Sequence, residues 1–107
     1  VACAASDGFD CGFDFEFIPA GADAAARARL QRWTATEAVL KAAGRGLSAA
    51  GEVRLDADLY CGRIAGVSYT LHGIDLGSSY AAHLATPEPV IDVRIAAVPP
   101  APAAPAP

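Results

Sequence analysis

The sequence predicts an α+β domain, a two-layer α/β sandwich whose mostly antiparallel sheet of four or five strands packs against one long helix. Four short segments alternate apolar with polar residues, which is the pattern of half-buried strands. One longer segment, rich in alanine and arginine, has a helical composition. The expected order is β-α-β-β-(α or β)-β, which is the ferredoxin-like pattern if the fifth element is a helix.

The first strand is expected at residues 9–17, where aromatic side chains alternate with acidic ones. Because alternate residues share one face of a strand, the aromatic side chains form one surface, which we expect to pack against the helix. The acidic residues then face water, since a buried unpaired carboxylate costs several kcal/mol. The aromatic face comprises Phe9, Cys11, Phe13, Phe15 and Phe17, and the other face carries Asp10, Asp14 and Glu16.

The helix is expected at residues 22–43, and Gly44 and Gly46 end it. Thr34 and Glu37 have the spacing of a capping box, which leaves open a bend near Thr34, although one continuous helix is the preferred interpretation. Its apolar stripe should cover the aromatic face of the first strand. That stripe consists of Ala22, Ala26, Leu30, Trp33 and Leu40.

The second half of the domain is expected to complete the sheet. Alternation predicts strands at 53–59 and 67–72, antiparallel to each other and joined by a turn or bulge at 61–66. Residues 78–85 fit a short helix capped by serine as well as they fit a strand, so both alternatives stay open. A last strand is expected at 91–97.

The chain of 107 residues is expected to contain a single domain at residues 9–98. Residues 1–8 are small and polar and should form a flexible N-terminal arm. Residues 99–107 are almost entirely proline and alanine, and they cannot repay the entropy cost of ordering. We therefore expect a disordered C-terminal tail.

Charge and hydropathy argue against two classes of partner. The net charge of −4 and the acidic face expected on the first strand disfavour nucleic acid, which binds clustered cations. No apolar stretch is long enough to span a bilayer. The expected partner is therefore another protein or a second copy of this chain. The abundance of alanine, arginine, glycine and proline suggests a GC-rich bacterial genome.

The three cysteines, Cys3, Cys11 and Cys61, are too few for a disulfide scaffold, so reduced thiols and a cytoplasmic location are expected. Removal of a signal peptide before Val1 would instead place the protein in the periplasm or outside the cell. A Cys11–Cys61 disulfide is the alternative in that case.

No motif specific for catalysis, nucleotide or metal is present, so no catalytic residue, cofactor or metal is assigned. The leading hypothesis is a non-catalytic module that binds another protein or assembles with itself through a sheet edge or its helix. The alternative is a small enzyme or metal-dependent accessory protein. Its candidate residues are His72, His83, Asp75 and Cys61, and their spacing does not match a structural zinc site.

Overall fold

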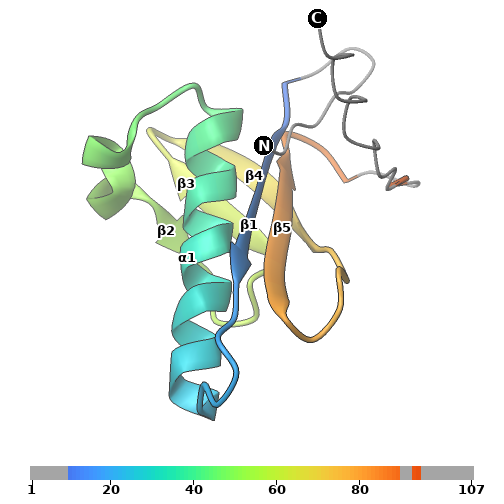
Figure 1. Cartoon of the computed structure of the whole chain (residues 1–107). Coiled ribbons are helices and arrows are strands. Elements are labelled where there is room, and N and C mark those ends of the chain that lie inside the picture. The colour runs from blue at the N-terminus through green and yellow to red at the C-terminus, as the bar shows by residue number, and fades with distance from the viewer. Residues whose placement is uncertain (1–9, 90–92, 95–107) are drawn as a thin grey trace, which may run out of the picture.

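The computed structural model describes residues 10–89 and 93–94, which form a five-stranded antiparallel sheet with one long helix packed against it (Figure 1). This confirms the α+β class and the two-layer arrangement. The elements are β1 (Gly12–Phe17), α1 (Ala24–Ala42), a 3-10 helix (Leu47–Glu52), β2 (Arg54–Leu55), β3 (Cys61–Ile64), β4 (Val67–Gly73) and β5 (Tyr80–Thr86).

The strands lie in the order β1-β5-β4-β3-β2, so the last strand of the described chain pairs with the first. Strands β2 to β5 follow one another as an antiparallel meander, and β1 adds to the free side of β5. Strands β1 and β2 are therefore the two edges. The segment containing α1 connects these edges, and the helix lies against the sheet between them (Figure 1).

The fifth element, which the sequence left open, is strand β5. Its signal is weak because β5 is a central strand: Ala81 and Ala85 lie on the helix side, and Ala82 and Leu84 are buried on the other side. A strand covered on both faces loses the apolar–polar alternation. Among the described residues α1 is the only α-helix and the sheet has five strands, but one of the five is β3, which was expected as a turn and which separates β2 from β4.

The predictions for the middle of the chain need correction. The strand expected at 53–59 is only two residues long, because Asp56 Oδ1 accepts hydrogen bonds from the backbone N–H groups of Tyr60 (2.8 Å) and Cys61 (3.0 Å) and turns the chain. The turn expected at 61–66 is mostly strand β3. Only Ala65 and Gly66, with φ of 53° and 78°, form the tight turn into β4.

Several predictions lie wholly or largely outside the described residues. These are the arm at 1–8, the tail at 99–107 and most of the strand at 91–97, of which Val93 and Arg94 are described and are not in a strand. In the part of the chain that is described, no helix has both the length and the apolar character needed to cross a membrane.

The helix is continuous, as preferred, and begins after Asp23, whose side chain accepts a hydrogen bond from the Ala26 N–H at 2.8 Å. Its buried face differs from the predicted stripe. Leu40 is buried as expected, whereas Trp33 is 39% exposed and Val39, which lies off the predicted stripe, is fully buried. The buried helix residues are Thr34, Ala35, Ala38, Val39, Leu40 and Ala42.

Strand β1 presents the opposite face to the helix from the one predicted. Gly12 and Asp14 are buried beneath α1, whereas Phe15 and Phe17 are 37% and 60% exposed on the other side of the sheet. The reason is the close approach of the two layers. A β-carbon at Gly12 would overlap backbone atoms of Ala38 and Ala42, so no phenylalanine fits between β1 and the helix.

Candidate functional site

Strand β1 carries two chemically different surfaces, one on each face of the sheet. Its helix-facing side holds carboxylates in a mostly alanine-lined layer, and its other side presents aromatic rings at an edge of the sheet.

The aromatic surface consists of a chain of rings on β1 and β5. The ring centroids of Phe13 and Phe15 lie 6.3 Å apart, and those of Phe15 and Tyr80 5.9 Å apart. Phe17 extends the chain, with its centroid 6.0 Å from that of Tyr80 in an edge-to-face arrangement. Phe15, Phe17 and Tyr80 are all exposed. Contiguous exposed apolar side chains of this kind mark interaction surfaces.

Within the described residues, no strand pairs with the outer side of β1. Ile18 N–H donates to Ser79 O at 2.7 Å, so by the alternation of an antiparallel pair the even-numbered residues bond to β5. The N–H and C=O groups of Phe13, Phe15 and Phe17 therefore point away from the sheet. The Lys41 ammonium group donates to Phe13 O at 3.2 Å and occupies one end of this edge.

The acidic surface brings three carboxylates together. Asp14 and Glu16 come from β1, and Glu37 comes from α1. One oxygen from each lies within 4.8 Å of the others. Lys41, one helical turn after Glu37, donates to Asp14 Oδ1 at 2.9 Å. When all four side chains are ionised, the three carboxylates carry three negative charges and Lys41 supplies one positive charge.

Asp14 is the buried member of this cluster, at 5% exposure. Its Oδ1 is paired with Lys41, but its Oδ2 is the only buried side-chain oxygen or nitrogen in the described residues without a hydrogen-bond partner. A buried carboxylate oxygen with no partner carries a desolvation cost, which a proton on the neighbouring Glu37 carboxyl would offset. The acidic cluster therefore contains one buried oxygen that accepts no hydrogen bond from the described residues.

The pKa of Glu37 is raised by its position in this cluster. Burial, hydrogen bonding to Asp14 and the negative charges of Asp14 and Glu16 together raise the pKa of Glu37 to about 7, against the opposing effect of Lys41. A protonated Glu37 can donate to the Asp14 carboxylate, which is how the cluster lowers its own charge. A titratable carboxyl with this pKa is typical of functional sites, although structural ion networks also produce it.

A buried histidine adjoins the cluster. His83 stands opposite Asp14 in the β1–β5 register, and its Nδ1 lies 2.7 Å from Thr34 Oγ1 on the helix. Thr34 Oγ1 also lies 3.0 Å from Gln31 O, so this hydroxyl links the His83 ring to the helix backbone. Burial lowers the pKa of His83, with the charge of Asp14 opposing this, so the neutral ring is favoured.

The four residues proposed from sequence do not form one site. His83 faces the helix, whereas His72 lies on the other face of the sheet and its Nε2 lies 3.1 Å from Thr86 Oγ1. Asp75 is exposed in the loop after β4, where its Oδ1 accepts from Gly77 N–H. Cys61 is at the start of β3 and, like Cys11, is a free thiol.

Sequence reasoning missed the carboxylate cluster because it assigned the acidic face of β1 to solvent. The available signal was Gly12, which has the same parity as Asp14 and Glu16. A glycine in a strand often marks a close approach of another backbone. Gly12 and the alanines of the helix together indicate that the acidic face of β1 lies beneath α1.

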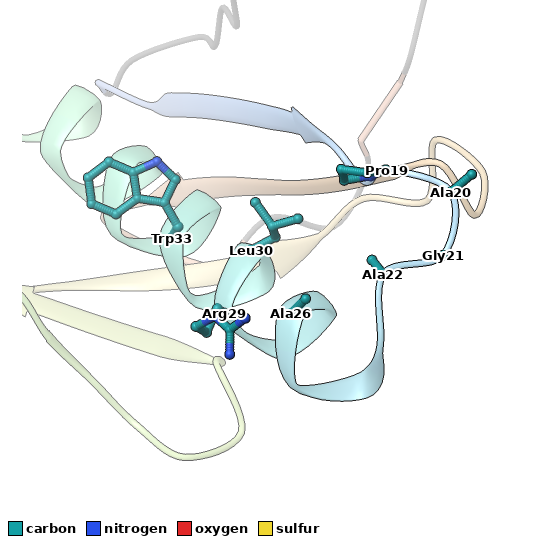
Figure 2. A pocket seen from close by; sticks show the side chains of 8 residues that line it. All are labelled: Pro19, Ala20, Gly21, Ala22, Ala26, Arg29, Leu30 and Trp33. Carbon is teal, nitrogen blue, oxygen red and sulfur yellow. The ribbon is translucent and has the colours of Figure 1, made fainter.

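A shallow groove of about 530 Å³ lies at the start of the helix. Figure 2 shows Leu30 and Trp33 projecting from successive turns of α1, with Pro19 on the segment that joins β1 to the helix. The lining is mostly small and apolar, and Arg29 is its only charged residue. The groove thus offers apolar contact but no group suited to acid–base chemistry.

Comparison with known proteins adds no relative: no protein-family model, no curated protein and no solved structure matches the chain.

Proposed function

We propose that this domain is a self-associating module in which strand β1 of one copy pairs with strand β1 of a second copy. The observation that carries the proposal is the outer edge of β1, which no other strand of the described residues pairs with and which lies next to an exposed aromatic surface. An unpaired edge strand is a template for another strand, and exposed apolar side chains beside it make pairing favourable. The dispersal of His72, His83, Asp75 and Cys61 further supports binding over catalysis.

The sequence of β1 suits pairing with itself. In an antiparallel pair centred on Phe15, each Phe13 stands opposite Phe17 of the second copy, so all six phenylalanines share one face of a continuous sheet. Aromatic residues opposite one another stabilise paired strands. A contact of this kind uses the same residues on both chains and closes as a two-fold dimer.

The charges at this edge also fit a second copy. In the same register, Asp14 stands opposite Glu16 of the second copy, which alone would be repulsive. Lys41 is half exposed and lies at this edge, where it contacts both Asp14 Oδ1 and Phe13 O. The ammonium group of each copy can therefore neutralise the acidic pair that the dimer creates.

A protein partner fits this surface better than nucleic acid does, although the face is aromatic rather than acidic as first expected. The two arginines on the aromatic side of the described strands, Arg54 and Arg63, lie on β2 and β3 at the opposite edge of the sheet. The net charge is −4. Phosphates close to the aromatic rings would therefore meet no cluster of cations.

Sedimentation velocity over about a hundredfold range of protein concentration tests the proposal, because dimerisation depends on concentration. We expect twice the chain mass of 10.9 kDa at high concentration. Phe17→Ser should remain monomeric. The matched control is Tyr60→Ser, which removes another exposed aromatic ring away from β1 and should still dimerise.

Amide hydrogen exchange distinguishes strand pairing from other contacts. The N–H groups of Phe15 and Phe17 should exchange freely at low concentration and become protected where the dimer forms, because they then donate to the second copy. A dimer without this protection would contradict edge pairing. A monomer at every concentration, or stoichiometric binding of a single-stranded oligonucleotide that Phe17→Ser abolishes, would overturn the proposal.

A further inference from the structure

We infer that Asp14, Glu16 and Glu37 form a binding site for one divalent cation of the oxygen-preferring class, with Mg²⁺, Mn²⁺ and Ca²⁺ as its chemical candidates. The site lies on the helix side of β1 and does not depend on self-association. It joins two residues of a strand to one residue of the helix that packs on it.

The geometry of the oxygens fits such an ion. Cations of this class bind carboxylate oxygens at about 2.0–2.6 Å, so two oxygens on one ion lie at most about 4–5 Å apart. One oxygen of each of the three carboxylates lies within 4.8 Å of the others, inside this limit. A small adjustment of the half-buried Glu16 and Glu37 side chains can shorten these separations further.

A second observation points to a ligand at this position. Asp14 Oδ2 is buried and has no hydrogen-bond partner in the described residues, while Oδ1 of the same carboxylate is held by Lys41. The ion pair fixes the Asp14 side chain and leaves one oxygen free. A bound cation would satisfy this oxygen when Glu37 has no proton to donate to it.

The balance of charge also fits. Three carboxylates and one ammonium group leave a charge of −2, which a divalent cation neutralises. All three protein ligands are carboxylates and no thiol belongs to the cluster, which favours the harder cations over zinc or copper. Water molecules would complete the coordination sphere, as is usual for Mg²⁺ and Ca²⁺.

Mn²⁺ is the probe for the test, because its paramagnetic resonance signal reports the free ion, and Mg²⁺ and Ca²⁺ are then added as competitors. The full chain should bind one Mn²⁺. Asp14→Asn and Glu37→Gln should each weaken binding by about tenfold or more, as loss of a charged ligand does. The control Glu52→Gln removes an equal charge at an exposed ion pair with Arg45 and should leave binding unchanged.

Lys41→Gln provides a test in the opposite direction. Removing the ammonium group raises the negative charge of the cluster and frees Asp14 Oδ1, so Mn²⁺ should bind several-fold more tightly. Glu16→Gln replaces Asp14→Asn if the latter does not fold. The inference is overturned if Mn²⁺ does not bind, if the carboxylate variants bind as tightly as Glu52→Gln, or if Lys41→Gln weakens binding.

Discussion

Replacing Gly12 by alanine tests the placement of β1 directly, because the two possible faces of the strand predict opposite results. In the structure, Gly12 lies beneath the helix, and an added β-carbon would overlap the Ala38 carbonyl oxygen and the Ala42 nitrogen. Both are backbone atoms within α1, so neither can rotate away as a side chain would. The helix would have to move outward from β1.

The cost follows from that movement. Separating the layers by about 0.5–1 Å forfeits about a quarter to a half of the dispersion attraction between the atoms across the gap. We therefore expect Gly12→Ala to lower the free energy of unfolding by about 3 kcal/mol, at the upper end for an overpacked core. Urea denaturation measures the change, read from the midpoint with the slope held constant.

The control is Gly73→Ala in β4, where an added β-carbon meets nothing within 4 Å and φ is not positive. It should change the free energy of unfolding by less than about 0.5 kcal/mol. If Gly12→Ala proved as harmless as Gly73→Ala, then Gly12 would face solvent, the phenylalanines would face the helix, and the carboxylate cluster would not exist.

Two further predictions concern ionisable and buried polar groups of the same layer. Because the pKa of Glu37 is raised in the folded state, its contribution to the free energy of unfolding is fully present below about pH 4.5 and is lost as pH rises through about 7. Stability should therefore decline over this pH range, and Glu37→Gln should make the decline shallower. Urea midpoints measured at each pH with a chelator present test this. A decline of unchanged slope in the variant would show that another group causes it. Thr34→Val should cost about 1–3 kcal/mol in the same assay, because it leaves His83 Nδ1 buried without a partner. Thr36→Val, which removes a hydroxyl that bonds only within the helix, should cost much less, and equal losses would contradict this role of Thr34.

The fold class and most element types follow from the sequence because they depend on periodicity, which is a local property. The alternation at 67–72 predicts β4, and the composition of 22–43 predicts α1, and both are observed. Strand β5 was left ambiguous because both of its faces are buried, which removes the polar half of the pattern. The shortening of β2 depends on one side chain, Asp56, which turns the chain through hydrogen bonds that no periodicity reports.

The candidate site could not be predicted in the same way, because its existence depends on which face of β1 meets the helix. Burying an unpaired carboxylate is costly, and this argument assigned Asp14 to solvent. It failed because Asp14 is not unpaired: Lys41, 27 residues later, reaches it from the helix. The alternation of residues within β1 gives no information about a partner 27 residues away, whereas it does show that a carboxylate on the buried face would be costly.

The space between the layers, rather than the polarity of the strand, decides the orientation of β1. The helix side chains at 35, 38 and 42 are alanines spaced by three and four residues, so they form one narrow stripe that permits close approach. The helix can approach this closely only over a strand face that contains a glycine, and in β1 this is the face of Gly12. The acidic residues of that face are then enclosed with it, and the helix residues that precede Ala38 and Ala42 are Glu37 and Lys41. Close packing of alanine and glycine therefore has two consequences. It brings the charged cluster together where α1 meets β1, with Asp14 buried and Glu16, Glu37 and Lys41 partly exposed. It also leaves the aromatic residues on the other face of the edge strand that we propose pairs with a second copy.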